Sequence, residues 1–309
     1  MKGLAFTLRK NVISKGLRKV ALLALYMAVM RNPLLGRYRR YLLSTWHTPR
    51  RRGRLDNFVY GAVFSAWLRY EYYPEPDPEV REGKKELCMG GRSGVAWAQT
   101  YNSRQLDFSA RVGNMPILEA NPVYSTLESV LGANINHPDC VVQIGSSSGR
   151  EVAWLAENFP EVLCIGTDVF PEVIEYARRF HSAKNLEFRV LATKDIGALL
   201  EGLDRKNVVV FSSGSLQYVQ PEHVETFFGT LSQVPGTQMI LVEPASMVPR
   251  DPRDLEESMP RGNFSYTHNY QAIAERNSCV TLECKIIRPY GASDPVHAST
   301  AHYFWNGST

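Results

Sequence analysis

The sequence predicts an α/β protein, in which helices cover both faces of a twisted, mainly parallel sheet. Two observations carry this prediction. Short runs of apolar and β-branched residues, such as Cys140–Ile144, alternate with stretches whose apolar residues recur at helical spacing. The first of these runs ends in a loop of small residues, Gly145–Gly149, and the next run ends in a carboxylate, Asp168. This order indicates a strand, a tight turn, a helix and a second strand.

The other elements follow with short connections. Parallel strands are expected at 140–144, 162–168, 186–191, 207–211 and 238–242, and an antiparallel pair at 279–287 and 299–305 brings the sheet to seven strands. Helices are expected at 150–159, at 171–180, around Val224–Leu231, and from within Phe264–Tyr270 to Arg276.

The loop after the first strand has a definite chemistry. Small residues let the backbone approach a ligand closely, and the helix that follows presents unpaired N–H groups to it. The carboxylate of Asp168 can accept both hydroxyls of a ribose. The glycine spacing does not fit the dinucleotide fingerprint, because Arg150 holds its third glycine position. A nucleoside-containing cofactor is therefore predicted at the carboxyl edge of the sheet.

The same loop resembles the first motif of class I S-adenosylmethionine-dependent methyltransferases, acid-x-Gly-x-Gly-x-Gly. Gly145, Ser147 and Gly149 occupy its glycine positions, Asp168 takes the place of the ribose-binding acid, and Gln143 stands where the family usually has Asp or Glu. The resemblance implies a Rossmann-like sheet over about residues 120–309, with S-adenosyl-L-methionine as cofactor. The cofactor-binding residues that it implies are Gln143, Gly145, Ser146, Ser147, Gly149, Asp168, Val169, Thr193, Asp195, Ser212 and Ser213. Asp195 is equally suited to start a helix.

Two other interpretations fit these residues. Gly145-x-Ser147-x-Gly149 also matches the nucleophile elbow of α/β-hydrolases, although the upstream strands and oxyanion loop of that fold are not evident. A methyltransferase-like scaffold without catalytic activity is the other interpretation, and the departures at Gln143 and Ser147 favour it.

The segment Ser212–Tyr218 resembles the motif that follows the fourth strand in methyltransferases. It lacks the Asp/Asn-Pro-Pro-Tyr of enzymes that methylate base amines, and it lacks metal-binding acids, so no metal site is predicted. His268 is the first candidate for a catalytic base, and Glu243 is the second. Tyr218 is a predicted pocket residue, with packing under the next helix as the alternative. Three further histidines compete with His268: His223, His297 and His302.

The basic residues are concentrated at the N-terminus. Residues 1–55 contain 14 of the 35 lysines and arginines and no acidic residue, which leaves 21 basic and 31 acidic residues in the remainder. The apolar run Val20–Met30 has about half the length that a membrane-spanning helix needs. Arginines alternate with aromatic and apolar residues up to position 54, a pattern that favours attachment of residues 1–54 to an anionic membrane surface. A packed basic arm, a signal peptide and a mitochondrial transit peptide are the alternatives, and no motif supports nucleic-acid binding.

Three regions are expected: a basic, aromatic-rich helical region (1–73), a linker and cap segment after the prolines at 74–78 (74–119), and the methyltransferase domain (120–309). The five cysteines show no metal-binding spacing and are interpreted as reduced, buried thiols of a cytoplasmic protein, or of the mitochondrial matrix in a eukaryote. The expected reaction is O-methylation of a glycan, lipid-linked or small-molecule hydroxyl acceptor. A natural-product methyltransferase without membrane association is the closest alternative, and the oligomeric state is left open.

Overall fold

A computed structural model describes the parts of the chain that hold the predicted sheet. The described residues are 63–89, 138–204, 207–244, 257–262, 264–287 and 299–305, with isolated positions at 24–28 and 94–99. The chain divides into two compact units, 1–93 and 94–309. Most of the basic N-terminal region, the histidine at 297 and residues 245–256 of the insertion after the fifth strand lie outside the described residues.

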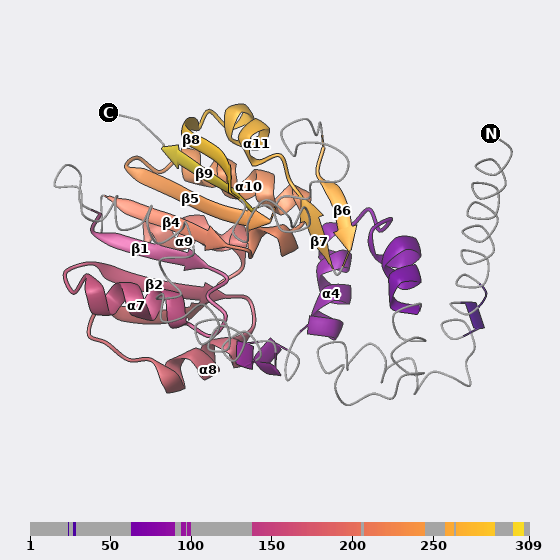
Figure 1. The fold of residues 1–309 in the computed structure, drawn as a ribbon, viewed down its shortest axis with the longest axis horizontal. Coiled ribbons are helices and arrows are strands. Elements are labelled where there is room, and N and C mark those ends of the chain that lie inside the picture. Colours follow the sequence, from indigo (N-terminus) through magenta and orange to yellow (C-terminus); the bar gives the residue numbers. More distant parts are fainter. Residues whose placement is uncertain are drawn as a thin grey trace, which may run out of the picture. The chain divides into compact units, whose positions relative to one another are not determined.

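The second unit contains a seven-stranded sheet in the order β3-β2-β1-β4-β5-β9-β8. Figure 1 shows the strands side by side, with β9 and β8 at one edge. The first five strands run parallel, whereas β9 pairs antiparallel with both β5 and β8. The strands are β1 (Cys140–Ile144), β2 (Leu163–Asp168), β3 (Leu186–Val190), β4 (Val208–Ser213), β5 (Thr237–Pro244), β8 (Val280–Ile287) and β9 (Ser299–Trp305). This topology confirms the predicted fold class.

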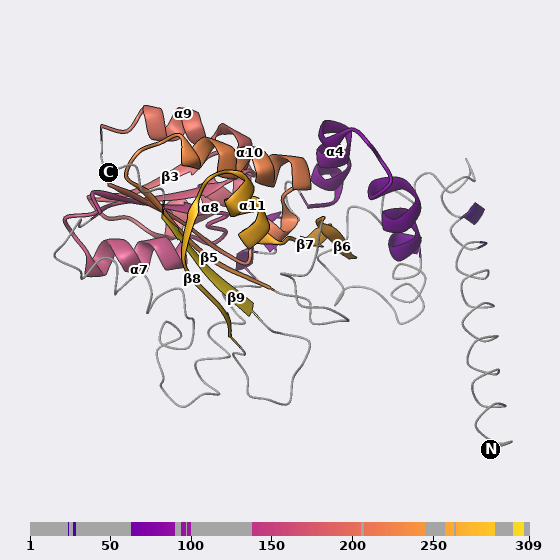
Figure 2. The same ribbon diagram turned by 90° about the horizontal axis from the view of Figure 1, so that it is seen from above.

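Helices cover both faces of the sheet. The view from above in Figure 2 shows α9, α10 and α11 on one side and α7 on the other. The helices described around the sheet are α7 (Arg150–Asn158), α8 (Pro171–Phe180), α9 (Ile196–Glu201), α10 (Pro221–Ser232) and α11 (Tyr270–Arg276). Alternation along β1 directs Val141 towards α7 and α8 and Val142 towards the opposite layer, so each face has its own apolar core. Phe227 and Phe228 of α10 are fully buried, and each stabilises the fold by about 1.5–3 kcal/mol.

The structure corrects the predicted end of the fourth strand and adds two strands that were not predicted. The fourth strand does not stop at Phe211 but continues to Ser213, because Ser212 and Ser213 stay paired with β5. The last helix opens at the final residue of the predicted Phe264–Tyr270 segment and ends at Arg276, as expected. Ser265–Thr267 forms a strand, β7, that pairs with β6 (Met259–Gly262).

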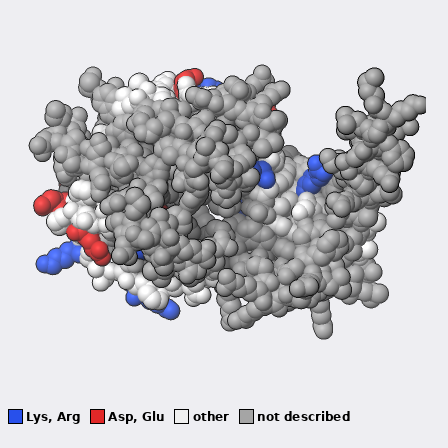
Figure 3. Space-filling view, in the orientation of Figure 1, with Lys and Arg blue, Asp and Glu red and all other residues white. Residues whose placement is uncertain are grey.

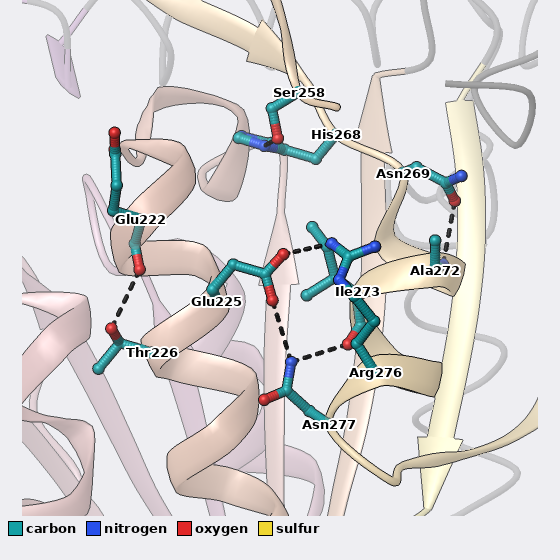
Figure 4. A network of polar contacts seen from close by, with 10 residues as sticks. All are labelled: Glu222, Glu225, Thr226, Ser258, His268, Asn269, Ala272, Ile273, Arg276 and Asn277. Atoms are coloured by element: carbon teal, nitrogen blue, oxygen red, sulfur yellow. Dashed lines mark hydrogen bonds and ion pairs between the residues drawn. The ribbon is translucent and has the colours of Figure 1, made fainter. Parts of the chain in front are cut away.

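A polar network fixes the beginning and the end of α11. The Asn269 side chain caps the helix by accepting a hydrogen bond from the backbone N–H of Ala272 at 3.1 Å. Near the other end, Glu225 of α10 accepts hydrogen bonds from Arg276 and from Asn277 (Figure 4). These contacts hold α11 against α10 and so position the segment before α11, which contains His268.

The first unit contributes two described helical stretches. Residues 63–67 are helical and continue into a π-helical turn, η3 (Leu68–Tyr72), and α4 (Pro78–Met89) follows. Three aromatic residues of this stretch, Phe64, Trp67 and Tyr72, are buried. None of the described helices is long and apolar enough to cross a membrane. On the face that Figure 3 shows, the described charged side chains include both signs.

Candidate functional site

The predicted cofactor loop forms a tight turn between β1 and α7. Gly145, Ser147 and Gly149 all have positive φ angles, of 68°, 49° and 78°. The turn is tied to β2, because the N–H of Ser146 donates to the carbonyl oxygen of Thr167 at 2.6 Å. A side chain at Gly149 would collide with the ring of Phe188, whose nearest atoms lie 2.6 Å from the Cβ position. The two glycines and Ser147 therefore give the turn the small, open backbone that the sequence predicted.

Asp168 faces this turn from the end of β2. One carboxylate oxygen accepts a hydrogen bond from the backbone N–H of Ser147, and the other accepts one from Phe170, both at 3.2 Å. The side chain is partly exposed. The structure thus brings together the turn and the acid that were predicted to bind the cofactor.

Buried polar atoms under the turn lack a partner among the described residues. The Oγ atoms of Ser146 and Ser147 and the Oε1 atom of Gln143 are buried and make no hydrogen bond within this part of the chain. Such groups usually have a partner, because an unsatisfied buried polar atom costs about 1–3 kcal/mol. A ligand with polar groups at this edge would satisfy them, so the residues present fit the polar end of the implied cofactor.

The ends of β2 and β3 form a second side of the site. The N–H of Leu191 donates to the carbonyl of Asp168 at 3.0 Å, which holds the two strand ends together. Val169 and Val190 expose 38% and 48% of their surface there, as an apolar patch that suits a flat base. Thr193 is buried, whereas Asp195 is exposed and takes the N-cap position of α9 without a side-chain capping bond. Of the two predicted adenine contacts, Asp195 is the more accessible.

Glu243 organises the third side of the site, at the end of β5. Its carboxylate is 1% exposed and accepts hydrogen bonds from Ser212 Oγ at 2.6 Å and from three successive backbone N–H groups at 3.0–3.2 Å. These N–H groups belong to Ser215, Leu216 and Gln217, which lead into the short 3₁₀ turn η5 (Leu216–Tyr218). Burial raises the pKa of Glu243, and these hydrogen bonds oppose that rise.

These contacts correct two predicted roles. Glu243 was a candidate base, but both of its oxygens hold the turn after β4, which gives the carboxylate a structural role. Ser212 was a predicted cofactor contact, but its side chain is fully buried and donates to Glu243. Its neighbour Ser213 is partly exposed and remains a predicted contact. The predictions missed the buried network because it depends on β4 and β5 being neighbours in the sheet.

The turn that Glu243 holds also fixes the cofactor loop. The Ser215 Oγ donates to the carbonyl oxygen of Gly145 at 3.1 Å. A Cβ atom at Gly145 would lie 2.3 Å from that Oγ, so only glycine allows the two loops to meet in this way. The sequence predicted Gly145 as a residue that makes room for a ligand, and the structure adds that it makes room for Ser215.

The hairpin of β6 and β7 packs on the turn after β4. Arg261 of β6 donates to the Gln217 side chain at 3.2 Å, and the Tyr266 hydroxyl donates to the Gln220 side chain at 2.8 Å. Tyr218 lies partly buried in this turn. Burial and the negative charge of Glu243 raise its pKa, and Arg261 opposes them, so the phenol is neutral and can donate a hydrogen bond.

His268 lies between β7 and α11, where the ring is 2% exposed. Its Nδ1 atom is 2.8 Å from Ser258 Oγ. Figure 4 shows the two side chains next to each other. The ring centroid of His268 lies 5.7 Å from that of Tyr266 and 5.3 Å from that of Tyr270. Burial lowers the pKa of His268 to about 4. The ring is therefore neutral at pH 7, although backbone hydrogen bonds with Leu216 and Val219 oppose this lowering of the pKa. Nε2 is buried and makes no hydrogen bond of normal geometry to the described part of the chain.

The competing candidates gain less support. His223 lies on α10, and His302 lies on β9, where the structure describes the backbone alone. For the hydrolase interpretation, Ser147 would need a base, yet its Oγ makes no hydrogen bond to any group in the described part of the chain. Among the described residues, no cluster of histidine, cysteine or acidic side chains could hold a metal ion.

We expect Glu243→Gln to lower the free energy of unfolding by about 2 kcal/mol, because the side-chain NH₂ group would face a backbone N–H that needs an acceptor. Urea denaturation of the full chain measures the change. Glu175→Gln is the control, since this exposed residue of α8 only pairs with Arg178 at the surface, and its change should stay within about 0.5 kcal/mol. Equal stability of Glu243→Gln and the wild type would contradict the structural role.

The buried His268 predicts a loss of stability in mild acid. The pKa is 6.5 in the unfolded chain and about 4 in the folded protein, so below pH 6.5 the unfolded chain binds the proton more readily. Stability should fall as the pH drops from 6.5 towards 4, by about 3 kcal/mol in total from this residue. Urea denaturation between pH 4 and 7.5 should show that His268→Gln flattens this dependence. Parallel curves for the variant and the wild type would rule out a buried neutral ring.

A family model described as "Methyltransferase domain" matches residues 141–235, from β1 to the residues after α10. No curated protein matches the chain. Among solved structures, the chain is similar to a TehB-like SAM-dependent methyltransferase from Corynebacterium glutamicum, at 15% identity over 68% of this chain and 97% of that chain, with a TM-score of 0.43.

Two further solved structures are similar to this chain. The magnesium protoporphyrin IX methyltransferase from Synechocystis, solved with bound SAH, is 13% identical over 68% of this chain and 98% of that chain, with a TM-score of 0.43. A SAM-dependent methyltransferase from Leishmania major is 12% identical over 79% of this chain and 90% of that chain, with a TM-score of 0.48. The sheet order, the site geometry and the family match over residues 141–235 together show that the chain has an α/β methyltransferase fold.

Proposed function

We propose that this protein is an S-adenosyl-L-methionine-dependent methyltransferase that methylates a hydroxyl group of a glycan, lipid-linked or small-molecule acceptor. One observation carries the cofactor part of the proposal. The turn Gly145–Gly149 faces the Asp168 carboxylate at the carboxyl edge of a parallel sheet, and buried polar atoms of the turn lack partners. The family match to this segment supports the same cofactor.

Each side of the site has a task in this proposal. Asp168 accepts the ribose hydroxyls, Val169 and Asp195 bind the adenine, and Ser146 and Ser147 bind the polar end of the cofactor. The cofactor supplies a methyl group on a sulfonium, which leaves as a neutral thioether when the carbon–sulfur bond breaks. The turn at Ser213–Tyr218 lies beside this edge, so we assign it to the position where the acceptor oxygen approaches the methyl group in line.

The acceptor hydroxyl loses its proton as the new oxygen–carbon bond forms. We assign this proton to His268, because its ring is neutral at pH 7 and has a nitrogen outside any normal hydrogen bond. A histidine with a pKa of about 4 is a weak base. It suffices when the proton leaves late, because an oxygen that already carries the incoming methyl group is strongly acidic. Tyr218 can donate a hydrogen bond to the same acceptor.

The location of the protein follows from the basic N-terminal region. We propose that the enzyme is cytoplasmic and that residues 1–54 attach it to an anionic membrane surface. If the source is eukaryotic, the proposed location of the protein is the mitochondrial matrix. The sequence pattern supports this proposal, because the arginines are interleaved with aromatic and apolar residues. Such attachment favours a lipid-linked or glycan acceptor, whereas a protein without it is better suited to a soluble natural product.

The cofactor is tested by calorimetric titration of S-adenosylhomocysteine into the wild type and Asp168→Asn. We expect micromolar binding by the wild type and affinity at least about tenfold lower in the variant, because the ribose loses a charge-assisted hydrogen bond. Glu175→Gln, on the exposed face of α8, is the control and should bind like the wild type. If the folded wild type does not bind, the protein is no methyltransferase; if it binds but a screen of hydroxyl acceptors gives no O-methyl product, the scaffold interpretation is favoured.

Membrane attachment is tested by pelleting the full chain with vesicles of phosphatidylcholine and phosphatidylserine. Replacement of the arginines at 50, 51, 52 and 54 by glutamine removes about 1 kcal/mol of attraction per charge, so we expect binding to fall by more than tenfold. Vesicles of phosphatidylcholine alone are the control and should bind both proteins weakly. Equal pelleting of both proteins with the anionic vesicles would exclude the proposed attachment.

A further inference from the structure

A buried carboxylate lies under the cofactor loop, at a position that the sequence motif does not include. Glu151 belongs to the first turn of α7 and is 5% exposed. Its Oε2 atom accepts a hydrogen bond from the side-chain Nε2 of Gln143, which is 1% exposed and lies on β1 one residue before the end of the strand. The two side chains therefore form a pair between the strand and the helix, directly beneath the turn that joins them.

The pair leaves one acceptor unused. Since Nε2 of Gln143 faces the carboxylate, the other atom of the same amide group, Oε1, stands next to it, and this buried oxygen makes no hydrogen bond. A negative charge and an unpartnered amide oxygen side by side are the groups that bind an ammonium group. The unpartnered hydroxyls of Ser146 and Ser147 lie in the adjoining turn, before the N-terminus of α7, and these groups suit a carboxylate.

The two sets of groups together match an α-amino acid, which carries an ammonium and a carboxylate on one carbon atom. The proposed cofactor ends in such an amino-acid moiety. We propose that Glu151, oriented by Gln143, binds the ammonium group of this moiety. Glu151 of the helix, held by Gln143, then takes the place of the acid that the family usually has on the strand. This inference rests on the proposed function.

The test uses two ligands that differ in the amino-acid moiety. S-adenosylhomocysteine carries it, whereas 5′-deoxy-5′-methylthioadenosine keeps the nucleoside and the thioether but lacks it. Calorimetric titration of both ligands into the full-length wild type and Glu151→Gln compares their affinities. We expect Glu151→Gln to lower the affinity for S-adenosylhomocysteine by at least about tenfold, as for the loss of a buried charge-assisted contact. The affinity for methylthioadenosine should stay unchanged.

Two further variants separate a binding role from a structural one. Glu157→Gln makes the same change on an exposed position of the same helix and should bind both ligands like the wild type. The double variant Gln143→Glu/Glu151→Gln moves the charge from the helix to the strand while keeping a pair of similar size. Because the charge stays within one hydrogen bond of its original place, we expect this variant to recover most of the affinity for S-adenosylhomocysteine.

The possible outcomes are distinct. If Glu151→Gln lowers the affinity for both ligands equally, the pair only supports the turn and the proposal is overturned. Unchanged affinity for S-adenosylhomocysteine would also overturn it. If neither ligand binds to the folded wild type, the result instead contradicts the proposed function and also this inference, which rests on it. Loss confined to S-adenosylhomocysteine, with recovery in the double variant, would support Glu151 as the ammonium ligand.

Discussion

The buried carboxylate of Glu243 is the interaction on which the rest of the site depends. A carboxylate without water needs donors for its oxygens, and the turn after β4 supplies three backbone N–H groups while Ser212 supplies a hydroxyl. The backbone N–H groups of this turn in return gain acceptors, which the neighbouring strands and helices do not provide. This exchange fixes the path of the chain at the edge of the sheet, where Ser215 reaches Gly145 and the hairpin of β6 and β7 packs.

The proposed site thus has a rigid centre between two sides. On the proposed cofactor side, the turn after β1 and the Asp168 carboxylate offer small residues, exposed apolar surface and polar atoms without partners in the described part of the chain. On the proposed acceptor side, burial raises the pKa of Tyr218 and lowers that of His268, so both side chains are neutral at pH 7. This division suits the proposed reaction, in which the cofactor carries a charged sulfonium and the acceptor a neutral oxygen.

Much of the fold and of the cofactor side could be predicted from the sequence, because both depend on local patterns. Cys140–Ile144 is apolar except for Gln143 and is followed by a glycine, and Asp168 ends the next apolar run. The first strand, turn, helix and strand therefore follow directly. The site residues whose partners are distant in sequence could not be assigned. Glu243 was a plausible base by its position at a strand end, and only its partners 26–31 residues away gave it another role.

The sequence by itself determined the seven strands of the main sheet, their order along the chain and the residue types of the cofactor turn, because periodicity and small residues act over a few positions. Only the tertiary structure decided which polar groups meet across the sheet. It placed Glu151 against Gln143, Ser215 against Gly145, and His268 in a buried, neutral state. Burial and pairing between distant segments decide charge and hydrogen bonding, and neither is encoded at any single position of the chain.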